Sequence, residues 1–150
     1  YLASNPLLVK KSISLTKDIC QACKVLDASE NDYACKISAK LFEKTLFAGL
    51  VINQVVNGVF ELVFMDKLRQ ALDNILDVEY LLSLCFSGEY LSEDVVSKLK
   101  KSACDLRRAL SDKIKSEVSR RSKIQPQDPF FNPSFSRYYD FSLLEEIDEN

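Results

Sequence analysis

Few residues of this chain have the types and spacing that catalysis requires. The sequence contains no histidine, the commonest general base at neutral pH, and no glycine-rich phosphate loop or nucleophile elbow. Glu79 falls near the apolar stripe of a predicted helix and could be a buried carboxylate suited to acid–base chemistry. Most such groups are structural, so we interpret Glu79 as an edge-of-core residue that pairs with a lysine or bonds to a tyrosine or asparagine. We therefore expect no catalytic residue and no enzymatic activity.

The pair Cys20 and Cys23 is the best candidate for metal or redox chemistry, because thiols at positions i and i+3 share one helix face. A zinc site needs about four ligands, and the chain offers neither a histidine nor a second close pair of cysteines. Cys85 and Cys104 fall on facing helices, where cysteine is more often a small core residue. We expect neither a metal ion nor a cofactor.

Positive charge concentrates in residues 93–124, which contain ten lysines and arginines against five acids. Lys101, Arg108 and Lys115 recur every seven residues on the face opposite the core, and Lys100 with Arg107 forms a neighbouring row. Such rows can neutralise phosphates, although aspartates within one turn would also permit a solvated face of ion pairs. We predict contact with RNA or DNA through Lys98, Lys100, Lys101, Arg107, Arg108, Lys115, Arg120 and Arg121.

Residues 125–150 differ in composition from the rest of the chain. They carry one arginine and six acids, a net charge of −5, whereas residues 1–124 have a net charge of +3. Three prolines within eight residues favour extended backbone, and aromatic residues too apolar for an inert linker follow. The segment could be a disordered terminus; we favour a tail that binds the bundle, a neighbouring subunit or a partner. Its predicted interaction residues are Phe130, Phe131, Phe135, Tyr138, Tyr139, Phe141 and Leu144.

Four amphipathic stretches must position these residues. Apolar side chains recur at spacings of three and four from about Pro6 to Val25, from about Asp32 to Gly58, from Met65 to Phe86 and from Ser92 to Lys123. In the second stretch, from Ala48 onward, apolar residues cover nearly all helical faces; a short strand near Gly58 would also fit, but we favour a helix.

Turn signals separate the four stretches. Ser29 with Asp32 resembles a capping box, and Ser92 can cap the fourth helix. Gly58 and Gly88 are predicted to end the second and third helices, because glycine accepts the left-handed backbone that helix ends often need.

These patterns predict an all-α fold, an antiparallel up-and-down four-helix bundle over residues 1–124 with an extended aromatic and acidic C-terminal tail over residues 125–150. The longest apolar stretch, residues 46–63, is too polar for a membrane span, so we expect no membrane association. An odd number of cysteines and no visible signal peptide favour reduced thiols in the cytoplasm. A second helix that is apolar on all sides favours a homo-oligomer.

The order of elements resembles a bacterial family of four-helix bundles. This family includes proteins encoded in intervening sequences of large-subunit ribosomal RNA and the accessory variability proteins of diversity-generating retroelements. The likeness is strongest in Leu68-Arg-Gln-Ala-Leu-Asp-Asn-Ile-Leu-Asp-Val-Glu-Tyr-Leu-Leu-Ser-Leu84, Gly88-Glu-Tyr-Leu-Ser-Glu-Asp94 and Leu106-Arg-Arg-Ala-Leu110, and looser from Leu8 to Ile52. For the retroelement branch, the resemblance implies a basic homo-oligomer that binds nucleic acid and works with a reverse transcriptase.

The pattern and the resemblance together predict a non-catalytic accessory or scaffold protein. It would assemble with itself and assist a nucleic-acid-processing enzyme such as a reverse transcriptase, through the basic fourth helix. The alternative is a protein-interaction adaptor that binds no nucleic acid and uses its aromatic tail for recognition.

Overall fold

The computed structural model describes the backbone of residues 4–58 and 64–124, and the side chains of residues 7–58 and 64–120. The tail at 125–150 with its seven predicted interaction residues, the side chain of Arg121, and residues 59–63 lie outside this described part. Within it, the chain forms four helices and no strand.

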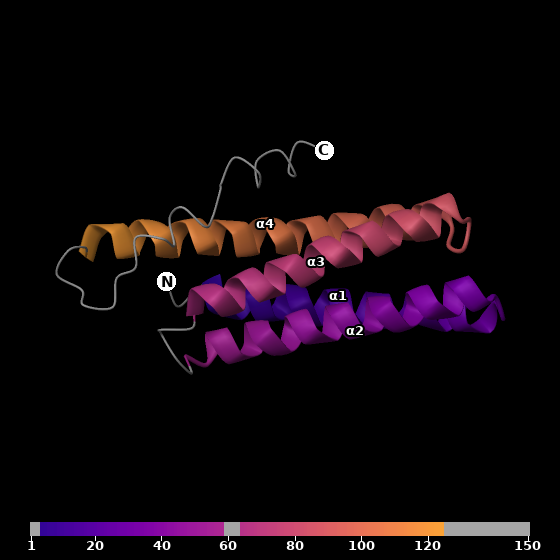
Figure 1. Ribbon diagram of the computed structural model, residues 1–150, viewed down its shortest axis with the longest axis horizontal. Coiled ribbons are helices and arrows are strands. Elements are labelled where there is room, and N and C mark those ends of the chain that lie inside the picture. Colours follow the sequence, from indigo (N-terminus) through magenta and orange to yellow (C-terminus); the bar gives the residue numbers. More distant parts are fainter. Residues whose placement is uncertain (1–3, 59–63, 125–150) are drawn as a thin grey trace.

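The helices are α1 (Ser4–Ala28), α2 (Asp32–Val56), α3 (Phe64–Ser87) and α4 (Glu93–Ile124). Each helix packs along its neighbour in sequence, and α4 also contacts α1, which closes the ring (Figure 1). This arrangement confirms the all-α, antiparallel up-and-down four-helix bundle. With 32 residues, α4 is the longest helix, and its C-terminal end extends past the start of α3 (Figure 1).

The core consists of the apolar stripes that the periodicity predicts. Each helix contributes side chains with almost no exposed surface, because the stripes face one another along the bundle axis. The largest of these are Leu15, Ile19, Leu26, Leu41, Ile52, Met65, Leu68, Ile75, Leu82, Leu106, Leu110 and Ile114. Phe86 departs from the pattern: its side chain is exposed, because the neighbouring Cys85 takes the core position in the last turn of α3.

The turn between α1 and α2 uses a different cap from the one predicted. The side-chain oxygen of Asn31 accepts hydrogen bonds from the backbone N–H groups of Tyr33 and Ala34, at 2.9 and 3.1 Å. Ser29 instead donates to the carbonyl oxygen of Leu26 at 2.6 Å. The predicted capping box of Ser29 and Asp32 is therefore wrong, because α2 begins at Asp32 and its N-cap is the preceding asparagine.

The turn between α3 and α4 also differs in detail from the prediction. Tyr90 N–H donates to the Cys85 carbonyl oxygen and Glu89 N–H to that of Phe86, the hydrogen bonds of a Schellman ending. The left-handed residue is Glu89, with φ 58°, and not Gly88. Gly88 serves another purpose, because a Cβ atom at this position would collide with the Tyr90 ring.

We expect the substitution Glu89→Gly to raise the free energy of unfolding by about 0.5 to 1 kcal/mol, because glycine adopts positive φ without the strain of a Cβ atom. Urea denaturation measures the change. The control Ala39→Gly, in the interior of α2, should instead lower stability by about 1 kcal/mol. A loss of stability in Glu89→Gly would show that its side chain has a role that outweighs the strain.

None of the helices in the described ranges combines the length and the apolar character that a membrane-spanning helix needs.

Candidate interaction surfaces and the hollow between α1 and α4

The cations predicted to bind nucleic acid do not share one surface. Lys98, Lys101, Arg108 and Arg120 are exposed, and Lys115 is half-buried. These five residues are called the α4 basic face below. The α4 basic face does not include the other three predicted cations. Lys100 is half-buried, Arg107 is buried, and the side chain of Arg121 lies outside the described residues.

Arg107 is an interhelical ion-pair residue. Its Nε donates to Glu79 Oε1 at 2.6 Å, and its Nη2 lies 3.2 Å from Cys104 Sγ. The Arg107 side chain is 5% exposed and that of Glu79 is 18% exposed, so the pair lies between α3 and α4. The prediction of an exposed row through Arg107 is wrong, because position 107 follows the core residue Leu106 and turns towards α3. The interpretation of Glu79 as a paired edge-of-core residue is confirmed, but its partner is an arginine and not the predicted lysine, tyrosine or asparagine.

Lys100 continues the same polar contact between α3 and α4. Its Nζ donates to Ser83 Oγ at 2.8 Å, and Ser83 Oγ donates to the Glu79 carbonyl oxygen at 3.1 Å. Glu79 and Ser83 are four residues apart on α3, and Lys100 and Arg107 are seven apart on the antiparallel α4. That spacing was visible in the sequence and could have indicated a cross-helix polar pair.

The α4 basic face is interspersed with acidic residues. Asp105 is half-buried and Asp112 is exposed, and both lie within four residues of Arg108. Such acids at helical spacing weaken the attraction of the face for phosphates. Three exposed cations, Lys98, Lys101 and Arg108, are the best-placed members of this surface for contact with an anionic partner.

A second surface lies on the outward side of α2. Four large apolar residues within nine positions are 39 to 55% exposed: Phe42, Leu46, Phe47 and Leu50. These residues are called the α2 apolar face below. The opposite side of the same helix is buried at Leu41, Thr45, Ala48 and Ile52. The all-round apolar character that the sequence indicated is therefore divided between the core and this exposed face.

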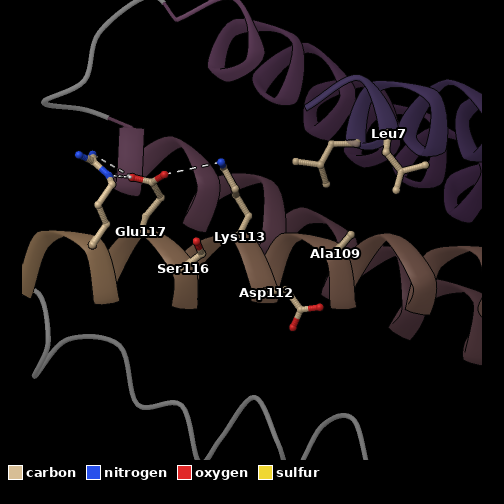
Figure 2. Close-up of a pocket in the computed structure, with 8 residues that line it drawn as sticks. Leu7, Ala109, Asp112, Lys113, Ser116 and Glu117 are labelled. Carbon is tan, nitrogen blue, oxygen red and sulfur yellow. Dashed lines mark hydrogen bonds and ion pairs between the residues drawn. The ribbon is translucent and has the colours of Figure 1, made fainter. Parts of the chain in front are cut away.

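A hollow of about 640 Å³ opens between the first turns of α1 and the C-terminal half of α4. We call it the α1/α4 hollow. Leu7 and Leu8 form the α1 wall, and Leu7 lies across from Ala109 of α4 (Figure 2). The α4 wall consists of Ala109, Asp112, Lys113, Ser116, Glu117 and Arg120.

Charged residues occupy the α4 wall at core positions. Glu117 is 3% exposed; one of its carboxylate oxygens lies 3.6 Å from Lys113 Nζ, and the other accepts hydrogen bonds from Arg120 Nε and Nη2, both at 3.1 Å (Figure 2). Lys113 Nζ also lies 5.8 Å from the centre of the Phe64 ring. The carboxylate of Asp112 points away from this group (Figure 2). The cluster of Lys113, Glu117 and Arg120 therefore has a formal charge of +1.

Sequence reasoning missed this cluster, although its signal was present. The buried stripe of α4 runs through Leu99, Leu106 and Leu110 and continues at the same spacing to Lys113 and Glu117. Two charged residues at core positions are unusual, because burying an ionised group is costly unless it is paired.

The cysteines occupy ordinary packing positions. Cys23 donates to the Ser38 carbonyl oxygen at 3.4 Å, and Ser38 Oγ donates to the Cys23 carbonyl oxygen at the same distance. Burial raises the pKa of the Cys85 thiol to about 11, and the neighbouring Cys23 adds to the shift. Among residues 4–58 and 64–124, no three acidic or cysteine side chains group as metal ligands would.

We expect Cys85 to react with iodoacetamide at pH 8 about 100-fold more slowly than a thiol of ordinary pKa, because the thiolate is the nucleophile and burial suppresses it. Mass spectrometry after timed labelling measures the rate at each cysteine. In urea all five cysteines should react at similar rates. Equal rates for Cys85 and the half-buried Cys104 in the folded protein would contradict the prediction.

Comparison of the sequence with models of protein families and with curated proteins finds no match. The fold is similar to a crystal structure from Bacteroides thetaiotaomicron, described as a protein with unknown function from the S23 ribosomal protein family. The TM-score is 0.67 at 20% sequence identity, and the match covers 75% of this chain and 98% of the other. At this identity the likeness shows that the two proteins share a fold.

Proposed function

We propose that the protein is a non-catalytic accessory or scaffold protein that forms a homo-oligomer and assists a nucleic-acid-processing partner such as a reverse transcriptase. The observation that carries the proposal is the α2 apolar face, with four large apolar side chains exposed on one helix of a well-packed bundle. Contiguous exposed apolar surface on a folded protein marks an interaction site more often than a solvated surface. Kinship with the retroelement accessory proteins belongs to the same proposal.

The positions of the α2 apolar face and the α4 basic face allow one surface to join subunits and the other to bind a partner. The helices pack in a ring in which α2 contacts α1 and α3, while α4 contacts the same two helices from the other side. The helices α2 and α4 therefore occupy opposite corners of the bundle. Subunits that join through the α2 apolar face would leave the α4 basic face accessible to an anionic partner.

Self-assembly is tested by the double substitution Leu46→Asp with Leu50→Asp. Both side chains are exposed, so the bundle should still fold, while two carboxylates at the subunit contact should abolish association. Light scattering and sedimentation should give the monomer mass for this variant and a larger mass for the wild type. The control is Tyr80→Asp, which removes an exposed aromatic from α3 and should keep the wild-type mass.

Nucleic-acid contact is tested by charge reversal at Lys98, Lys101 and Arg108, with binding to single-stranded RNA and DNA measured over a range of salt concentrations. Loss of three phosphate contacts should weaken binding at least about 10-fold and reduce the dependence on salt. A variant with glutamates at Lys10, Lys24 and Lys36 changes the net charge equally on other exposed positions and should bind more tightly than the α4 variant.

The alternative function is a protein-interaction adaptor without nucleic-acid binding, which the acids among the α4 cations favour. Wild-type protein that fails to bind RNA or DNA even at low salt would support the adaptor and contradict the accessory role. Equal weakening by both charge-reversed variants would show attraction by overall charge and no dedicated site on α4.

A further inference from the structure

Apart from Arg120, the residues of the α1/α4 hollow have no role in the proposed function, yet its walls have a defined chemistry. One wall is apolar and accessible, because Leu7 is 52% exposed beside Leu8 and Ala109. The other wall presents Lys113 and Arg120, held in place by Glu117. A matching occupant would carry rings or aliphatic groups for the first wall and a carboxylate for the second.

We propose that this hollow is the docking site of the chain's own segment Asp128-Pro-Phe-Phe131, which binds in cis. The rings of Phe130 and Phe131 would pack on Leu7 and Ala109, and the carboxylate of Asp128 would face Arg120. The site lies apart from the α2 apolar face, and it shares one residue, Arg120, with the α4 basic face.

The length of the connecting chain fits this docking. Helix α4 ends at Ile124, and the hollow lies between Ala109 and Arg120 on the same helix. Going back from Ile124 to Lys113 covers eleven residues of helix, or about 16 Å at 1.5 Å per residue. The six residues from Ile124 to Phe130 span at most about 20 Å when extended. A chain that reverses direction after α4 is therefore long enough for Phe130 to reach the hollow.

The local sequence favours a helix end followed by an extended segment. Pro126 and Pro129 disfavour helical backbone in the residues before them, Gln125 and Asp128. This preference explains why α4 ends at Ile124, and it favours an extended backbone in the segment that follows. Because the connection is so short, the segment is held near the hollow at an effective concentration of roughly millimolar. Docking in cis is thereby favoured over docking on a second copy.

Charge and apolar character match on both sides of the proposed contact. The cluster of Lys113, Glu117 and Arg120 has a formal charge of +1, and residues 125–150 have a net charge of −5. Lys113 already lies over one aromatic ring, that of Phe64, so a phenylalanine is a compatible neighbour for this cation. Docking would remove the rings of Phe130 and Phe131 from water and would cover the exposed side chain of Leu7.

The test uses the full chain, which contains no tryptophan. The substitution Phe131→Trp introduces one fluorophore at the proposed contact, and quenching of its emission by acrylamide reports its burial. If the segment docks, the emission of the Phe131→Trp chain should be blue-shifted. Its quenching should also be at least about threefold weaker than in a chain that carries both Phe131→Trp and Leu7→Asp. Leu7 is half exposed, so this substitution should leave the bundle folded, as circular dichroism would check. The control Ile13→Asp, also exposed on α1 but outside the hollow, should not change the quenching.

A second matched pair probes the charge of the site. Ser116 and Ser119 are both exposed on α4, but only Ser116 lines the hollow. Ser116→Glu should repel the acidic segment and increase quenching of the tryptophan reporter at position 131, whereas Ser119→Glu should leave it unchanged. Quenching should also be constant over a roughly hundredfold range of protein concentration.

Three results would overturn the proposal. If the tryptophan at position 131 is quenched as strongly in the otherwise wild-type chain as in the Leu7→Asp chain, the segment does not dock. Equal effects of Leu7→Asp and Ile13→Asp, or of the two serine variants, show that it docks elsewhere. Quenching that falls as concentration rises shows that the segment binds a second copy. None of these readouts requires nucleic acid, and the Leu46→Asp, Leu50→Asp background separates them from self-assembly.

Discussion

Replacing Arg107 with methionine is expected to lower the free energy of unfolding by about 3 kcal/mol. Methionine keeps much of the side-chain volume, so the loss reports charge and hydrogen bonding more than packing. The guanidinium lies 2.6 Å from the Glu79 carboxylate in a contact that is mostly screened from water. Removing it leaves a largely buried carboxylate without the cation that the structure places beside it. Urea denaturation measures the difference.

The matched control is Lys44→Met, which removes a more exposed ion pair between neighbouring helices. Lys44 Nζ lies 3.1 Å from Asp77, but the two side chains are 33% and 54% exposed. Water screens such a pair, so its loss should cost no more than about 1 kcal/mol. Equal costs for the two variants would show that burial does not strengthen the contact of Arg107.

The double variant Arg107→Met with Glu79→Leu tests whether the ion pair itself stabilises the bundle. The alternative is that the pair adds little and only the loss of one partner is costly. Replacing both charged residues by apolar ones should recover most of the stability lost in Arg107→Met, because the desolvation cost of the pair disappears with it. A double variant as unstable as the single one would show that Glu79 contributes through contacts other than this ion pair.

The four helices and their buried faces were predictable because they follow from residue type and spacing. Burial of one stripe per helix is a local consequence of period 3.6, and Leu68, Leu82 and Leu106 all lie where that period places them. The cap of α4 was equally local: Ser92 accepts from the Val95 N–H at 3.3 Å. The left-handed residue at the end of α3 is Glu89 and not the predicted Gly88, where the nearby Tyr90 ring leaves no room for a Cβ atom.

The candidate surfaces were predictable only in part. The sequence pattern places Lys100 and Arg107 among the cations that contact nucleic acid, but exposure depends on which side of the helix meets α3 and α1. Arg107 is buried beside the core residue Leu106 and Lys113 continues the buried stripe, and Glu79 and Glu117 provide their ion pairs. The α1/α4 hollow depends on where α1 begins relative to the longer α4, a tertiary property that no local pattern contains.

Truncating Leu106 to alanine is expected to lower the free energy of unfolding by about 3 kcal/mol, within the usual range of roughly 2 to 5 kcal/mol for such core substitutions. The Leu106 side chain has no exposed surface, and its helix contacts both α1 and α3. The loss combines the transfer of the removed carbons with a cavity that helices fixed by several other contacts cannot close. Leu106→Met, which conserves volume, should cost less than about 1.5 kcal/mol.

This measurement needs a defined oligomeric state, because association of folded subunits adds a concentration-dependent contribution to apparent stability. Both Leu106 variants are therefore compared in the Leu46→Asp, Leu50→Asp background, where we expect a monomer. A loss below about 1 kcal/mol for Leu106→Ala would mean that the bundle repacks around the missing side chain. The interior next to Arg107 would then be loosely packed, and the loss of about 3 kcal/mol expected for Arg107→Met would have to come from charge alone.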